Sequence, residues 1–126
     1  MRIDLYRSSN ECFAFEAAYP WSGFVAIGWG HHFFLLSRET RQVLDVDLGN
    51  YFGQMVPASE YLLVASAERL FCFAQDGSLL WRSAPLGIDG VIVDQVVSGV
   101  VQGHGEWNPP GGWRTFTISL STGEPV

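Results

Sequence analysis

The sequence predicts an all-β protein made of three internal repeats, with little or no helix. Each repeat begins with an apolar strand, continues into a second strand and ends in a polar turn, and the repeats begin near residues 24, 61 and 99. Repeats of this length built from strands indicate sheets that stack on one another. No stretch combines the apolar spacing of a helix with helix-capping residues.

The first repeat, 11–48, is predicted to contain strands at 11–18, 23–29, 31–37 and 42–48. The two middle runs are apolar and are separated by Gly30, a residue that favours a turn. The last run alternates, so that two aspartates, Asp45 and Asp47, share one face while apolar residues take the other. This alternation indicates a strand with one face in water.

The second repeat, 51–82, is predicted to contain strands at 51–57, 60–66, 69–74 and 78–82. Its clearest segment is Leu70-Phe71-Cys72-Phe73, the turn Gln75-Asp76-Gly77 and then Leu79-Leu80-Trp81. Two short apolar runs that flank Asp-Gly are typical of a β-hairpin.

The third repeat, 88–126, is predicted to contain strands at 88–97, 99–105 and 113–120 and lacks a fourth. The run at 2–7 is left over, and we expect it to pair with the last strand near 116–120 and cover the edge of that sheet. The whole chain, 1–126, is therefore expected to be one domain of three blade-like antiparallel sheets with about four strands each.

This order of strands and turns resembles the blades of quinoprotein-like and WD-type β-propellers. The resemblance covers most of the chain and is closest at Leu70–Trp81. It implies sheets arranged as blades, and it brings no quinone-cofactor residues with it. Because propellers have four to eight blades, three sheets are expected to form an open propeller, to pair with a second copy into a six-bladed ring, or to pack as a propeller-like β-sandwich.

The core is expected at alternating positions of the repeated strands, because side chains on a strand alternate between its two faces. These positions are Val25, Ile27, Phe34, Leu36, Leu62, Val64, Phe71, Phe73, Val101, Phe116 and Ile118.

Composition limits the class of protein. The chain has 126 residues, of which 48% are hydrophobic and 14% aromatic, which is enough to bury a core. A net charge of −6 argues against a nucleic-acid partner and suits a basic protein partner. No apolar run approaches the roughly 20 residues of a membrane span, and we see no leader peptide. With two cysteines, expected as buried thiols, we predict a cytoplasmic protein.

The segment 103–113 interrupts the third repeat where the other two have tight connections. Inserted loops on a rigid sheet are common sites of function, and exposed indoles can anchor in a partner or stack on a sugar. The alternative is that both indoles fold back and cap the core. The candidate binding residues here are Trp107, Trp113, His104, Glu106 and Asn108. Of these, Trp107 is our first choice because it lies on the insertion itself.

Gly28-Trp29-Gly30-His31 occupies the equivalent place in the first repeat. Glycines there would permit tight turns or close approach of backbones. We therefore add Trp29 and His31 as candidates for a binding face shared with the insertion, although each hairpin would also account for its own glycines.

The sequence contains no nucleophile elbow and no phosphate-binding loop. Asp89 and Asp94 flank an apolar run and are interpreted as charges at strand ends. We expect a non-catalytic protein-binding module, in its most specific form an immunity-type or antitoxin-like inhibitor of a bacterial toxin, without cofactor or metal and with a homodimer left open. The alternatives are a carbohydrate- or small-ligand-binding module that uses the tryptophans, and a metal-dependent hydrolase centred on His104 and Glu106.

Overall fold

A computed structural model describes residues 16–107 and 111–126 of the chain. In this part the protein is all-β: eleven strands form three antiparallel sheets of four, four and three strands, without a helix. No helix in these residues is therefore available to cross a membrane. The predicted strand at 2–7 lies outside the described residues, so its pairing with 116–120 stays a prediction.

The first sheet has the order β1-β2-β3-β4. Its strands are β1 (Glu16–Trp21), β2 (Phe24–Trp29), β3 (His32–Ser37) and β4 (Val43–Asp47). The prediction ended the first strand at residue 18, but β1 continues through Pro20, which pairs with Val25. Proline is tolerated there because β1 is the edge strand, where a backbone N–H is not needed on both sides.

The second sheet has the order β5-β6-β7-β8 and the third has the order β11-β10-β9. The strands of the second sheet are β5 (Phe52–Ala58), β6 (Tyr61–Ser66), β7 (Leu70–Phe73) and β8 (Leu79–Arg82). Those of the third are β9 (Val91–Val97), β10 (Val100–Glu106) and β11 (Trp113–Ser119). A bridge between Ile118 and Pro125 adds a short C-terminal pairing to β11.

Each sheet opens with a hairpin whose turn has only two residues. The first residue of each turn is a serine in the left-handed region, with φ values of 55°, 58° and 51° at Ser22, Ser59 and Ser98. Gly99 is thus the second turn residue of the third hairpin, and Val100 is the equivalent of Phe24 and Tyr61. The predicted start of the third repeat at Gly99 was wrong by one residue, because a turn glycine was taken as the start of the strand.

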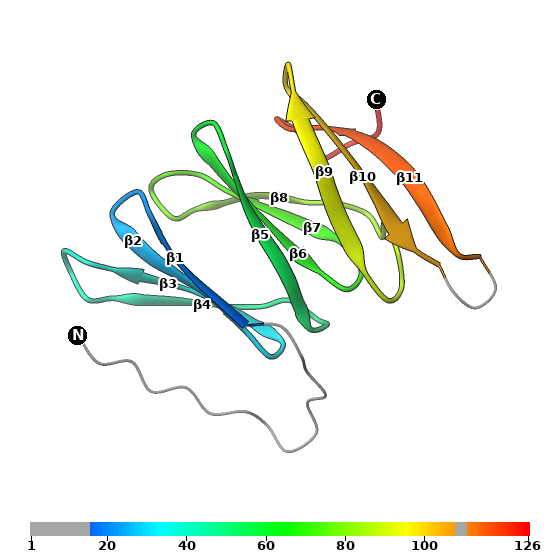
Figure 1. Cartoon of the computed structure of the whole chain (residues 1–126). Coiled ribbons are helices and arrows are strands. Elements are labelled where there is room, and N and C mark those ends of the chain that lie inside the picture. The colour runs from blue at the N-terminus through cyan, green and yellow to red at the C-terminus, as the bar shows by residue number, and fades with distance from the viewer. Residues whose placement is uncertain (1–15, 108–110) are drawn as a thin grey trace.

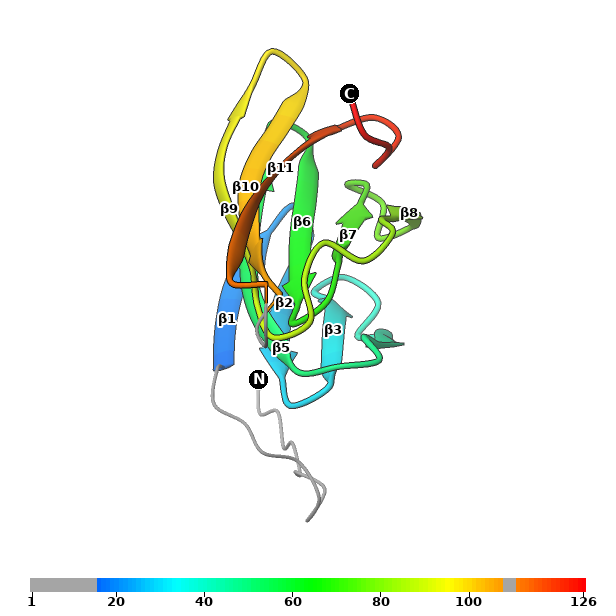
Figure 2. The same cartoon turned by 90° about the vertical axis from the view of Figure 1, so that its right-hand side faces the viewer.

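The three sheets stack face to face in chain order, as Figure 1 shows from left to right. One hydrophobic cluster joins the first sheet to the second, and a separate cluster joins the second sheet to the third. The first strands of the sheets are neighbours, since β5 contacts both β1 and β9. Figure 2 shows β1 and β9 along one side of the molecule and β8 on the opposite side.

Eight of the eleven predicted core positions are buried, whereas Val25, Phe34 and Phe116 are only partly buried. In the first sheet, however, the residues that face the second sheet have the opposite parity: Ala26, Phe33 and Leu35. The alternation argument failed here because these strands are apolar on both faces, as is typical of strands sandwiched between layers. The sequence pattern therefore could not say which face meets the neighbouring sheet.

The outer faces of the two terminal sheets differ in polarity. On the first sheet, most residues paired across strands on that face are apolar (Ala18, Pro20, Val25, Ile27, Trp29, Phe34, Leu36 and Val43), and four are ionisable (Glu16, His32, Asp45 and Asp47). On the third sheet, most residues of the corresponding face are polar (Gln95, Gln102, His104, Glu106, Thr115, Thr117 and Ser119), and four are apolar (Ile92, Val97, Val100 and Trp113). The third sheet therefore has the solvated outer surface expected of a capping repeat.

Candidate binding site

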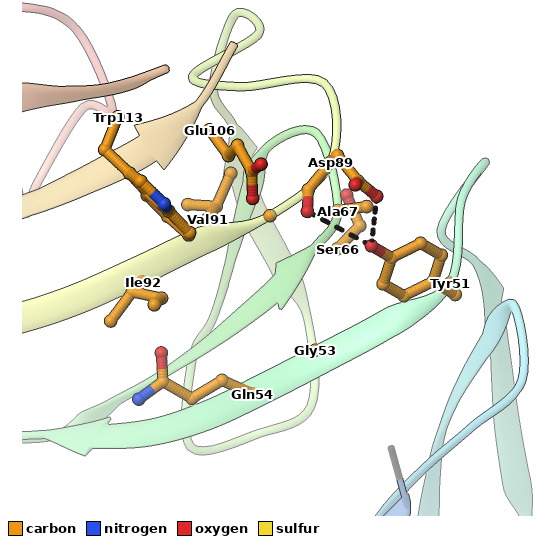
Figure 3. Close-up of a pocket in the computed structure, with 11 residues that line it drawn as sticks. Tyr51, Gly53, Gln54, Ser66, Ala67, Asp89, Val91, Ile92, Glu106 and Trp113 are labelled. Atoms are coloured by element: carbon orange, nitrogen blue, oxygen red, sulfur yellow. Dashed lines mark hydrogen bonds between the residues drawn. The ribbon is translucent and has the colours of Figure 1, made fainter. Parts of the chain in front are cut away.

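A cavity of about 490 Å³ opens where the second and third sheets meet, near the end of the molecule that carries the β10–β11 connection. Figure 3 shows side chains from β5, β9, β10 and β11 arranged around it. The lining residues are Tyr51, Gly53, Gln54, Ser66, Ala67, Asp89, Gly90, Val91, Ile92, Glu106 and Trp113. Its volume lies in the range of ordinary ligand sites.

One wall of the cavity is the loop between β8 and β9, which is fixed by backbone hydrogen bonds on both sides. The amide of Gly90 donates to Ala67 O at 2.8 Å, and the amide of Ile88 donates to Glu106 O at 2.7 Å. The loop can lie this close to β10 because residue 105 is glycine: a Cβ there would be 1.8 Å from Leu86 O. A larger residue at 105 would therefore push the loop away from β10.

Tyr51 and Asp89 form a hydrogen-bonded pair at the cavity. The Tyr51 hydroxyl donates to Asp89 Oδ1 at 2.7 Å and lies 3.2 Å from Asp89 O (Figure 3). Burial, the hydrogen bond to Asp89, and the charges of Asp89 and Glu106 raise the pKa of Tyr51 to about 12. The phenol is therefore neutral at physiological pH and serves as a hydrogen-bond donor.

Glu106 and Trp113 are paired across β10 and β11, and both line the cavity. The Trp113 side chain is 50% exposed and extends toward the start of β9, where a Cβ on Gly90 would be 3.3 Å from Trp113 Cη2. Glu106 is half-buried, and no side chain in 16–107 or 111–126 forms a hydrogen bond or ion pair with its carboxylate. The cavity thus presents a half-exposed indole beside a carboxylate that no described side chain pairs.

Gln54 and Ile92 lie at the part of the cavity between β5 and β9 (Figure 3). The Gln54 side-chain oxygen accepts a hydrogen bond from the Val93 amide at 3.2 Å, which ties the first strands of the two sheets together. At the inner end the lining residues Ser66 and Ala67 are fully buried. The site is consequently built on paired strands whose separation is fixed.

The structure brings together three candidate binding residues of the sequence analysis, His104, Glu106 and Trp113. His104 contacts Trp113 edge-on, with ring centroids 5.0 Å apart, although it does not line the cavity. Its Nδ1 lies 2.8 Å from Asp94 Oδ2 on the outer face of the third sheet. The edge contact of His104 therefore packs against the indole of Trp113 outside the cavity.

Trp107, the preferred residue of the sequence analysis, is half-buried and does not line the cavity. Its backbone closes the turn after β10, since its amide donates to Gly112 O at 2.7 Å and its carbonyl accepts from Gly111 at 2.7 Å. The Arg114 guanidinium lies 6.0 Å from the centre of its indole ring. The neighbouring candidate, Asn108, lies outside the described residues.

In the first sheet β2 ends at Trp29, and the turn from β2 to β3, which contains His31, lies at the same end of the molecule as the end of β10 (Figure 1). Trp29 Nε1 donates to Glu16 Oε1 at 2.9 Å, and the carbonyl of His31 accepts from the Leu48 amide. Neither residue lines the cavity. The structure therefore places the two Gly-aromatic-Gly segments at one end without joining them into one site.

The alternative of a metal site at His104 and Glu106 can be compared with the geometry. Within the described part of the chain, no group of three or more His, Cys, Asp and Glu side chains is arranged to hold a metal ion. The nearest carboxylate to His104 is that of Asp94, across the strand pair.

Sequence reasoning missed Tyr51, Gln54 and Asp89. Asp89 was interpreted as a charge at a strand end, and the signal that could have identified it is its place between Gly87 and Gly90, in a loop that must lie against another strand. Tyr51 and Gln54 are brought to the site only by the packing of β5 against β9, which no local pattern encodes. Comparisons with protein families, with curated proteins and with solved structures find no match to this chain.

Proposed function

We propose that this chain is a non-catalytic, cytoplasmic protein-binding module and that the cavity between the second and third sheets receives a side chain of its partner. The observation that carries the proposal is the half-exposed Trp113 beside Glu106, whose carboxylate no described side chain pairs, at a cavity whose lining includes the buried residues Ser66 and Ala67. Aromatic side chains next to a pocket are the usual energetic centres of protein interfaces.

The charge of the chain supports a basic partner. Its net charge is −6, and charges of opposite sign speed the encounter of two proteins. A small acidic module that blocks another protein fits an immunity-type inhibitor of a bacterial toxin, which is the specific form of the proposal. A toxin gene beside the gene for this chain would give the first candidate partner.

The finer architecture is also proposed rather than established: an open, three-bladed arrangement related to β-propellers. Three observations support it. The sheets stack in chain order, their first strands are neighbours, and each sheet begins with the same two-residue hairpin. In this arrangement the cavity lies beside the first strands of two adjacent blades, where the axis of a complete propeller would run.

A small-ligand or carbohydrate-binding module is the second candidate. The observation that favours it is the same wall: an open indole face with Gln54 and two carboxylates, which can stack on a sugar ring and accept its hydroxyl hydrogens. Thermal-shift screening with mono- and oligosaccharides separates the two candidates, because a saturating ligand raises the melting temperature of a native protein.

The proposal is tested by binding measurements with the products of neighbouring genes, using isothermal titration calorimetry. Trp113→Ala is expected to weaken the complex by about 2 kcal/mol or more, roughly 30-fold, as at other interface centres. Tyr19→Ala is the matched control, since Tyr19 is a 40% exposed aromatic residue of β1 that does not line the cavity. Both variants should melt close to the wild type.

A second variant tests the cavity itself. Val91→Phe is expected to fill the cavity from its floor and to weaken the partner as much as Trp113→Ala does, with overpacking costing at most about 1–3 kcal/mol of stability. Equal affinities of the wild type, Trp113→Ala and Val91→Phe for a partner that binds the folded chain would mean that the partner docks elsewhere.

A further inference from the structure

The ionisable side chains of the cavity wall are a phenol and two carboxylates. Tyr51 is neutral, Asp89 and Glu106 are acidic, and the remaining lining residues carry no charge. We propose that the cavity binds a cationic group, and specifically the guanidinium of an arginine side chain of the partner. This inference rests on the proposed function for the source of the cation, a protein partner. The preference for a cation is argued from the residues that line the cavity.

The carboxylate of Glu106 gives the first reason. In the described residues Glu106 makes its hydrogen bonds through the backbone, which accepts from Ile88 and donates to Gly90, and no described side chain pairs with its carboxylate. The carboxylate oxygens reach solvent, because no buried side-chain oxygen of the described residues lacks a hydrogen-bond partner. A cation that enters the cavity can therefore bind this carboxylate without displacing another described residue.

The arginines nearest the cavity in sequence are already engaged, and neither lines it. Arg69 forms an ion pair with Glu68 at 2.9 Å and donates to Ser83 O at 3.2 Å. The guanidinium of Arg114 lies over Trp107. The negative potential of the cavity is therefore left for a ligand from outside rather than for a residue of the described chain.

Asp89 supplies a second acceptor whose position is fixed. Its Oδ1 accepts the Tyr51 hydroxyl, and no described residue donates to its Oδ2. The hydroxyl hydrogen bond orients the carboxylate, and the high pKa of Tyr51 means that this phenol keeps its proton while it does so. A ligand with several N–H donors can satisfy Asp89 and Glu106 together, and guanidinium has five of them.

Trp113 selects a planar cation. Its indole is half-exposed at the cavity mouth, held from behind by His104 at a centroid distance of 5.0 Å. Cations are attracted to the face of an indole, and guanidinium stacks on it as well as donating in its own plane. An ammonium group gains the charge attraction but not the stacking, so the order expected is arginine, then lysine, with neutral side chains far weaker.

The experiment uses three small probes and two-dimensional NMR of the full chain. N-acetyl-arginine amide is expected to shift the Trp113 indole and Glu106 amide signals to saturation, while N-acetyl-citrulline amide, its neutral near-isostere, binds at least tenfold more weakly. N-acetyl-lysine amide should fall between them. Citrulline binding as tightly as arginine would overturn the proposal.

Two variants test whether the carboxylates of Glu106 and Asp89 bind the arginine probe. Glu106→Gln and Asp89→Asn are each expected to weaken the arginine probe about tenfold, whereas Glu39→Gln, an exposed acidic residue in the β3–β4 turn, leaves it unchanged. Glu106→Gln keeps the shape of a side chain whose carboxylate has no described partner, so its fold should be intact. An unchanged affinity in both cavity variants would show that the cation is not recognised here.

Repeating the measurements with the protein partner tests whether the cation is an arginine side chain of that partner. A partner whose affinity drops on Glu106→Gln and on replacement of one of its arginines supports the proposal in full. A partner that is weakened by Trp113→Ala but not by Glu106→Gln keeps the proposed function and overturns the cation site. Selective binding of the arginine probe without any protein partner keeps the cation site and overturns the proposed function.

Discussion

The two interfaces between sheets differ in what fills them. The first cluster is rich in aromatic rings, among them Phe33, Phe52, Phe71 and Phe73, and the rings of Phe33 and Phe73 are 4.9 Å apart. The second cluster is made mainly of Val, Leu, Ile, Ala and Cys. The ring of Phe52 fills the first interface at the start of β5, while the second interface contains the cavity at the equivalent place, the start of β9.

One pair of equivalent residues explains much of this difference. Phe52 of β5 pairs with Ser66, the sixth residue of β6, and Val91 of β9 pairs with Gly105, the sixth residue of β10. Both side chains face the preceding sheet. Phe52 fills its interface down to Gly28, whereas the smaller Val91 forms part of the cavity wall. The change from an aromatic to a small aliphatic residue thus distinguishes a filled core position from a position that lines a cavity.

The largest effect is expected at that pair. Phe52→Ala should lower the free energy of unfolding by about 3–5 kcal/mol, because a fully buried ring is removed from a packed interface. Val91→Ala removes fewer buried atoms beside an existing cavity and should cost about 1.5–3 kcal/mol. Urea unfolding measures both, and equal losses would mean that the two interfaces are equally well packed.

A smaller effect is expected at Gly28, where the first sheet contacts Phe52 of the second sheet. Gly28 lies under Phe52, and a Cβ there would be 2.2 Å from Phe52 Cε1, while the equivalent residue of the second sheet is Ala65. Gly28→Ala should therefore cost about 1–3 kcal/mol through overpacking.

The matched control for this prediction is Gly23→Ala, since nothing lies within 4 Å of a Cβ at residue 23. Its melting temperature should stay near that of the wild type. A second test combines Gly28→Ala with Phe52→Leu, because a smaller side chain over residue 28 should recover part of the loss. If the double variant shows no recovery, the contact between the two residues is not the cause.

A separate effect comes from alkaline pH and acts on the second interface. Burial raises the pKa of the Cys72 thiol from 9.0 to about 12, and Tyr51 rises from 10.0 to about 12. For both groups the folded pKa exceeds the unfolded one, so their contribution to stability is complete below the unfolded pKa. It should be lost as the pH rises from about 9 toward 12.

Urea unfolding between pH 8 and 11 measures this loss, and hydrogen exchange should show β7 and β9 opening before β2. A Cys72→Ala, Tyr51→Phe double variant should lose less stability over the same range. A profile identical to that of the wild type would assign the alkaline sensitivity to other groups.

The sequence was sufficient to predict most of the strands, because turn residues separate short apolar runs. It did not predict the two-residue turns: the first connection was expected at 19–22, whereas the observed turn is Ser22–Gly23. It could not predict which face of the first sheet is internal, since Val25 and Ala26 are both apolar and only the neighbouring sheet decides between them. The site was half predicted: Glu106 and Trp113 were found because the insertion breaks the repeat. Tyr51 and Asp89, which are 38 residues apart in the chain, meet only through the stacking of sheets.

The outer faces of the first and third sheets differ in how readily a further sheet could pack on them. The positions of the third sheet that carry Gln102, His104 and Thr117 correspond to apolar positions such as Leu63, Ala65 and Cys72 in the second sheet, which bind the next sheet. A further sheet added at that end, including one from a second copy that closes a six-bladed ring, would have to strip water from amides, hydroxyls and a His–Asp pair without compensation. The first sheet has a similar His–Asp pair on its outer face, His32 and Asp45, but most of the residues paired beside it are apolar, so a further sheet would remove less hydration there.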